Sequence, residues 1–272
     1  MLTTWLRALW TGALAIVLTA VTGGIWTALL VANLKSSPAI PWSAAAMAAI
    51  GYGLWRWLGG RGWPSRTREA RRALLRAEPL QAGAFFTMLF AGILGLVALA
   101  GLWIVLMETV HMPGNRLPDF RAYPVWTVAA VLITAAAVGA VFEEAGFRGY
   151  FQGTLERVLP GWTAILVTAL LMAPEHAVTQ GFVWPAMLFY LLVDLMLGTS
   201  ARLAKSILPG TAIHALGLLM FFAVIWPNDA TRPFVPRDGA GIWFWIHVAQ
   251  AVLFGTACIA AFARFGRTRS LA

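Results

Sequence analysis

Charged residues are scarce in this sequence: Asp, Glu, Lys and Arg make up 11% of its 272 residues, whereas hydrophobic residues make up 60%. An ordinary soluble domain carries about 25% charged residues. This composition excludes the soluble globular class and predicts an all-α, polytopic integral membrane protein. Acidic residues are rarer than basic ones, at 11 against 20, so an acid inside an apolar run requires an explanation.

Other absences narrow the class further. The single cysteine, Cys258, excludes an intramolecular disulfide and a cysteine-rich metal site. The sequence lacks the His-Glu-x-x-His pattern of zinc proteases, the Gly-x-Ser-x-Gly pattern of serine hydrolases, and a Gly-x-Gly-Asp sequence at Asp194. Since we find no internal repeat, no low-complexity tail and no soluble domain, residues 1–272 are predicted to form a single transmembrane domain.

Apolar windows predict the membrane spans. A helix needs about 20 apolar residues to cross a bilayer. Two shorter windows, 39–57 and 161–178, contain Pro, Gly or polar residues. We still count them as spans, because without them the loops on the two sides of the membrane would not balance. With these two, about eight transmembrane helices are predicted. The six clear windows are 8–31, 84–107, 125–145, 183–201, 206–226 and 241–263.

Basic residues predict the orientation of the bundle. Lys and Arg collect in the segments on one predicted side, including seven arginines between Arg56 and Arg76. The positive-inside rule therefore predicts a multi-pass plasma-membrane protein with both termini in the cytoplasm. We interpret the net charge of +9 as a topology signal, which favours membrane lipids over nucleic acid as the partner. Segment 58–80 is predicted to be the largest amphipathic or interfacial piece.

Three charged residues lie in or directly after the window 125–145: Glu143, Glu144 and Arg148. Glu144 and Arg148 stand at i and i+4 on a helix, with the acid first, which predicts an ion pair. Glu143 points about 100° away from Glu144. A carboxylate in apolar surroundings beside a like charge suits a general base for water.

Two histidines in later spans, His176 and His214, are predicted to share one chamber with the glutamates. Histidines on neighbouring helices can orient a water molecule, hold a metal or donate a hydrogen bond to an oxyanion. Asp194 is open between a helix–helix hydrogen bond and a role at the substrate gate. Glu175 is expected at a polar crevice or the outer surface, and His247 at the membrane interface.

Three motifs follow one another along the chain. They are Glu143-Glu144-x-x-x-Arg148, the helix that ends in His176, and Ser206-Ile207 followed by His214-Ala215. With these motifs, residues 125–226 resemble the CAAX protease and bacteriocin-processing family of intramembrane proteases, also called CPBP or Abi. Two positions depart from the family's usual motifs, since Met172 stands where Phe is usual and Leu218 where Asn is usual. Eight helices are typical of the family.

The resemblance implies an intramembrane endopeptidase, a hydrolase that cleaves membrane-embedded or lipid-anchored peptides or lipidated proteins. In this reading Glu143 activates a water molecule, His176 and His214 assist it, and Glu144 and Arg148 hold the site in shape. Glu143, His176 and His214 would be the ligands if a divalent metal such as zinc is bound, and a metal-free glutamate mechanism is equally open.

Two other classes of function stay open. A catalytically inactive membrane scaffold or immunity protein would keep the fold and lose site residues, and Leu218 favours that alternative because Leu offers no hydrogen bond. A proton-coupled transporter also keeps Glu, Asp and His within its spans, but it usually shows a repeat of interrupted helices, which we do not find. The sequence does not specify the substrate, the oligomeric state or the pathway.

Overall fold

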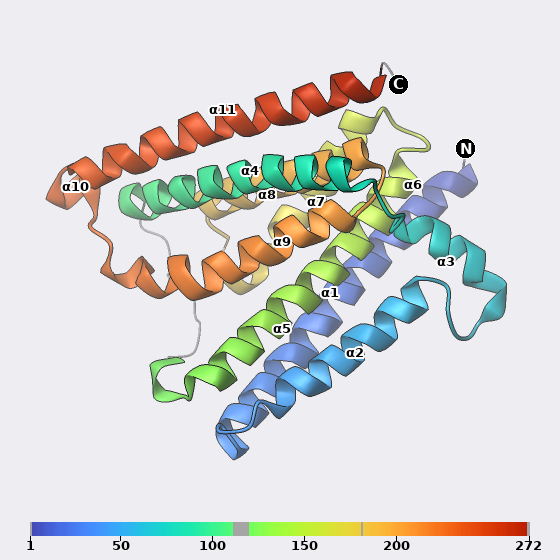
Figure 1. Ribbon diagram of the computed structural model, residues 1–272, viewed down its shortest axis with the longest axis horizontal. Helices are drawn as coiled ribbons and strands as arrows, with labels where there is room; N and C mark the ends of the chain where they lie inside the picture. The colour runs from blue at the N-terminus through green and yellow to red at the C-terminus, as the bar shows by residue number, and fades with distance from the viewer. Residues whose placement is uncertain (1, 111–119, 181, 271–272) are drawn as a thin grey trace.

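The computed structural model describes residues 2–110, 120–180 and 182–270, and it has a helix for each predicted span (Figure 1). Six helices among the described residues are long and apolar enough to cross a membrane, and α2 and α7 are not among those six. The all-α membrane fold is confirmed, with about eight as an approximate count. The eight helices are α1 (Leu2–Ser36), α2 (Trp42–Leu58), α4 (Ala82–Thr109), α5 (Val125–Glu143), α7 (Gly161–Gln180), α8 (Trp184–Ala204), α9 (Leu208–Met220) and α11 (Ile242–Ser270).

Short helical pieces complete the chain. The predicted interfacial segment 58–80 contains α3 (Arg68–Leu75), whose sequence is half basic or acidic. A π-helical segment, Glu144–Gln152, extends α5 and leads directly into α6 (Gly153–Leu155). A second π-helical turn, Phe221–Ile225, extends α9, followed by a 3-10 turn, Trp226–Thr231. The remaining pieces are 3-10 turns at Ser65–Thr67 and Phe120–Ala122, and α10 (Val235–Asp238).

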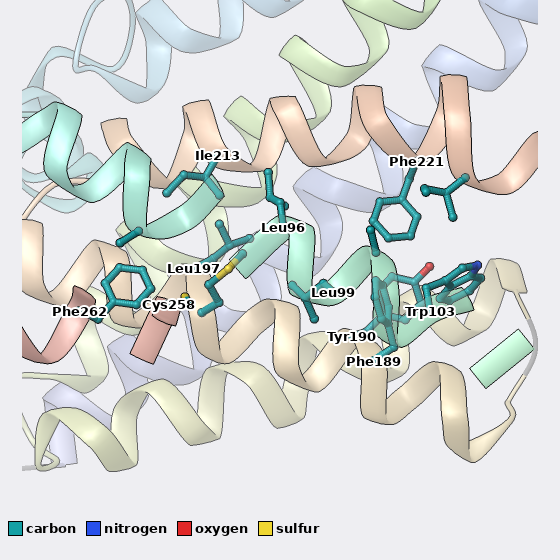
Figure 2. Close-up of a cluster of buried hydrophobic side chains, with 14 of the residues drawn as sticks. Leu96, Leu99, Trp103, Phe189, Tyr190, Leu197, Ile213, Phe221, Cys258 and Phe262 are labelled. Carbon is teal, nitrogen blue, oxygen red and sulfur yellow. The ribbon is translucent and has the colours of Figure 1, made fainter. Parts of the chain in front are cut away.

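The long helices form two packed groups. In Figure 1, α1, α2 and α5 run side by side along one diagonal, whereas α4, α8, α9 and α11 run across the other part of the molecule. The second group encloses an apolar core around α4, in which Trp103 packs edge-on against Phe189, with ring centroids 4.9 Å apart (Figure 2). Contacts between α5 and α9 join the two groups. The helices that carry the first and third motifs, α5 and α9, therefore meet where the groups join.

The two ends of the bundle differ in charge. Both chain ends lie near α3 and α6 in Figure 1, so the arginines between Arg56 and Arg76 share one end with the C-terminal end of α11.

Exposed tryptophans occur at the helix ends on both sides, as expected for residues at the two membrane–water interfaces. They include Trp5, Trp10 and Trp162 at the basic end, and Trp126, Trp184, Trp243 and Trp245 at the opposite end.

Close packing of α4 against α11 depends on Gly101. A Cβ atom at this position would lie 2.8 Å from the carbonyl oxygen of His247, a backbone atom that has little room to move. We expect Gly101→Ala to lower the free energy of unfolding by about 1–3 kcal/mol through overpacking. Thermal unfolding in detergent micelles measures this change. Gly83→Ala is the matched control on the same helix, because nothing lies within 4 Å of its Cβ position; equal midpoints for the two variants would contradict the prediction.

Candidate active site

The site is built on the π-helical segment that follows α5. All nine residues of this segment, Glu144–Gln152, are buried. A π-helix has a wider turn than an α-helix, and π-helical turns frequently occur at functional sites. Glycines allow neighbouring backbones to approach it: a Cβ at Gly146 would lie 3.1 Å from Ala15 Cα, and one at Gly149 would lie 2.8 Å from the Leu75 carbonyl oxygen. The segment is thus held between α1 and the end of α3.

Arg148 lies at the centre of this segment with none of its side chain exposed. Its Nη1 lies 3.3 Å from Glu144 Oε1, and its Nη2 donates to Asp194 Oδ1 on α8 at 2.5 Å. Nη1 also lies 2.8 Å from the sulfur of Met172 on α7. Because a buried charge is tolerated only when it is paired, the two carboxylates make the burial of Arg148 possible. The ion pair predicted from the i, i+4 spacing is present.

Asp194 is the partner that sequence reasoning did not place. A guanidinium has five N–H donors, more than one carboxylate can accept, so Arg148 can pair with a second acid. Asp194 and Glu175 are the other acids in the predicted spans, and the sequence contains no signal that assigns either of them to Arg148. In the structure Glu175, on α7, is partly exposed, and His247, on α11, lies 3.2 Å from Gln250 Oε1 through its Nδ1.

His214, on α9, lies between the two adjacent glutamates. Its Nδ1 forms a hydrogen bond of 3.0 Å with Glu144 Oε1, and its Nε2 lies 3.5 Å from Glu143 Oε2. This approach requires Gly210, one turn earlier on α9, since a Cβ there would lie 2.9 Å from Glu144 Oε2. Glu144 therefore contacts both Arg148 and His214, so α9 is connected to the same charge cluster as α8.

The two glutamates occupy different environments. Glu144 has none of its side chain exposed, whereas Glu143 keeps 15% of its side chain exposed. Glu143 lines a pocket of about 140 Å³ that it shares with Thr19 and Thr22 of α1. Of the two carboxylates, Glu143 is therefore the more accessible.

His176 and His214 line a different cavity, of about 70 Å³, whose remaining walls are mostly apolar. The ring of His176 stacks on Tyr190 of α8, with ring centroids 4.2 Å apart and 16° between the planes. Leu218 lines both this cavity and the pocket of Glu143. The single chamber expected from the sequence is therefore divided, with Leu218 at the place where the two spaces adjoin.

The predicted metal ligands do not form a three-ligand set in this arrangement. A catalytic zinc site requires three protein ligands around one ion. No three His, Cys, Asp or Glu side chains in the described part of the chain are arranged in that way. His214 directs one ring nitrogen to Glu144 and the other toward Glu143.

A comparison with protein families identifies the segment that carries this cluster. Residues 124–220 match the family described as type II CAAX prenyl endopeptidase Rce1-like. No curated protein and no solved structure matches the chain. The matched segment runs from the residue before α5 to the end of α9, so it contains all the residues that form the candidate site. Residues 124–220 are therefore similar to the Rce1-like family, as the motifs in the sequence predict, and the family description supports a CAAX-type intramembrane protease function.

Proposed function

We propose that the chain is an intramembrane endopeptidase that hydrolyses peptide bonds in membrane-embedded or lipid-anchored substrates, with Glu143 as the base that activates water. The observation that carries this proposal is that two adjacent carboxylates differ in their exposure and in their contacts. Glu144 is fully buried and contacts Arg148 and His214. Glu143 lines a pocket and stays partly exposed. A general base must reach the proton that it removes, which favours Glu143 because it is the more accessible of the two carboxylates.

In the proposed reaction, Glu143 accepts a proton from a water molecule while the water oxygen attacks the carbonyl carbon of the peptide. The separation of 3.5 Å between Glu143 Oε2 and His214 Nε2 is long for a direct hydrogen bond, which leaves Nε2 available to the water molecule. When the ring carries a proton on both nitrogens, Nε2 can instead donate to the developing oxyanion. The C–N bond then breaks, and the proton on Glu143 passes to the leaving amine. His176, which faces the same cavity as His214, would help to position the reacting groups.

The other charged residues would orient the reacting ones. Glu144 accepts a hydrogen bond from His214 Nδ1, which directs Nε2 toward Glu143. A carboxylate that orients a histidine ring in this way acts on its tautomer and its position. Arg148 and Asp194 keep Glu144 in place, so we assign Glu144 and Arg148 positioning roles.

The proposed partners are membrane lipids and an apolar peptide or lipidated protein, and nucleic acid is not among them. The walls of the cavity beside His176 and His214 are mostly apolar, including Phe189 and Leu197, which suits a substrate segment from the membrane. Prenylated CAAX sequences are one such class. We leave a divalent metal open as a cofactor. The proposed reaction steps use only the protein's own side chains.

An inactive membrane scaffold or immunity protein is a second candidate because of Leu218. This side chain lines both spaces at the site and offers no hydrogen bond to a water or a carbonyl group. A scaffold would keep the charge cluster for stability alone. A proton-coupled transporter, the third class considered, has no specific observation in its favour.

We also propose that the protein lies in the plasma membrane with both termini in the cytoplasm. In a Cys258→Ala background, a cysteine at Arg61 lies at the basic end and one at Thr231 at the opposite end, and both positions are exposed. We expect a membrane-impermeant maleimide to label Thr231→Cys in intact cells and Arg61→Cys only after permeabilisation, because basic segments stay on the cytoplasmic side. The reverse labelling pattern would contradict the orientation.

Replacing the proposed base tests the reaction. We expect Glu143→Gln to reduce cleavage by at least about 100-fold, because the amide keeps the shape but cannot accept the proton. The measurement is a comparison of new N- and C-termini in membrane proteomes of cells that express the intact protein or the variant at matched levels. His247→Asn is the control, since His247 lies outside the cluster on α11.

Identical termini in the two proteomes, with both proteins folded and abundant, would remove the protease proposal and favour the scaffold. In that case Leu218→Asn provides the next comparison. Cleavage that appears with Leu218→Asn and disappears with Leu218→Asn combined with Glu143→Gln would show that the leucine alone had silenced the site.

The charge cluster of Glu144, Arg148, Asp194 and His214 should also contribute to the stability of the fold. Arg148→Met leaves Glu144 and Asp194 buried without their cation, and we expect a loss of about 3–5 kcal/mol in the free energy of unfolding. Thermal unfolding in detergent micelles gives the ranking of variants. Arg237→Met is the control, because Arg237 pairs with Asp238 on the exposed surface and a pair of this kind contributes little. An Arg148→Met protein as stable as the control would disprove the structural role.

A further inference from the structure

A large pocket lies at the end of the bundle that holds both termini, away from the glutamates. Its volume is about 960 Å³. It is formed by α3, the end of the π-helical segment, α6 and the loop after it, and the ends of α8 and α11, which come together near the right-hand side of Figure 1. Four basic residues line it, Arg76, Arg157, Arg202 and Lys205, and we refer to it as the basic pocket.

The one acid in the lining, Glu156, is already engaged. Its Oε1 accepts a hydrogen bond from Gln152 Nε2 at 2.9 Å, and its Oε2 pairs with Arg76 Nη1 at 3.2 Å. Both carboxylate oxygens therefore have partners from the protein. Glu156 balances the charge of Arg76 and leaves the other basic residues of the pocket without a counter-charge.

Three positive charges remain on the walls of the basic pocket. Within the residues that the structure describes, Arg157, Arg202 and Lys205 form no ion pair with a carboxylate. Burial lowers the pKa of the Arg76 guanidinium, and the nearby charges of Arg202 and Arg157 act in the same direction, so these arginines repel one another. An anion between them would remove this repulsion.

The position of the basic pocket indicates the kind of anion. Arg202 and Lys205 lie at the end of α8, where a membrane span reaches the headgroup layer. Apolar side chains, Leu74 of α3 and Leu203 of α8, line the pocket beside the charges. Basic pockets between transmembrane helices on the cytoplasmic side are suited to anionic lipid headgroups. We propose that the basic pocket binds an anionic phospholipid, with its phosphate at Arg157, Arg202 and Lys205 and its apolar part along the two leucines.

The basic pocket also borders the segment that carries the candidate active site. Arg76 Nη1 donates to the carbonyl oxygen of Arg148 at 3.4 Å, and the carbonyl oxygen of Arg76 accepts a hydrogen bond from the Ile207 N–H, just before α9, at 2.9 Å. A bound lipid would therefore stabilise the junction of α3, the π-helical segment and α9. The proposal rests on membrane insertion and is independent of proteolysis.

The test uses the full chain in detergent micelles with added dioleoylphosphatidylglycerol, dioleoylphosphatidylcholine or inorganic phosphate. Native mass spectrometry counts retained lipid, and thermal unfolding gives the apparent affinity. We expect phosphatidylglycerol alone to be retained and to raise the unfolding midpoint. The triple variant Arg157→Gln, Arg202→Gln, Lys205→Gln should bind it roughly 100-fold more weakly, at about fivefold for each basic residue.

The control triple variant is Arg66→Gln, Arg68→Gln, Arg264→Gln. It removes the same charge from exposed positions at the same end, outside the basic pocket, and should bind as the intact protein does. If the pocket variant does not fold, the single variants Arg157→Gln and Lys205→Gln, at exposed positions, replace it. Equal retention of the two lipids, an equal loss of binding in both triple variants, or equal stabilisation by inorganic phosphate would each overturn the assignment to a phospholipid.

Discussion

The buried guanidinium of Arg148 is the constraint on which the arrangement of the helices depends. An unpaired cation in an apolar interior costs several kcal/mol, so carboxylates have to reach it. Glu144 does so from the same helix and Asp194 from α8, while Met172 of α7 contacts the remaining side. One charge therefore fixes the relative positions of the π-helical segment, α7 and α8, which follow one another along the chain.

Glu144 extends this constraint to α9, because it also accepts a hydrogen bond from His214. The change from α-helix to π-helix falls between Glu143 and Glu144, which are the last residue of α5 and the first of the π-helical segment. One carboxylate is fully buried and contacts Arg148 and His214 through its Oε1, and its neighbour lines a pocket. Different environments for two carboxylates are the usual way in which one site obtains two chemical roles.

The same segment is also held by Arg76, whose Nη1 donates to the carbonyl oxygen of Arg148 and so links the basic end of the bundle to the middle of the segment. Glycines make this possible, since a Cβ at Gly153 would lie 2.8 Å from the Arg76 side chain. The candidate site and the basic pocket thus both border the continuous helix Val125–Leu155, the site at the level of the apolar core and the pocket at the membrane surface. The candidate site and the basic pocket both reflect the free-energy cost of placing a charged side chain next to lipid.

The sequence by itself determined the membrane class, the helices and the Glu144–Arg148 pair. Long apolar runs must become helices in lipid because their backbone groups have no other partners there, and an i, i+4 pair depends only on local helix geometry. Only the tertiary structure decided that Asp194 and not Glu175 pairs with Arg148, that His214 lies between the glutamates, and that Leu218 separates two cavities. These contacts depend on the rotation and spacing of neighbouring helices, and spans that are apolar on every side do not encode either quantity.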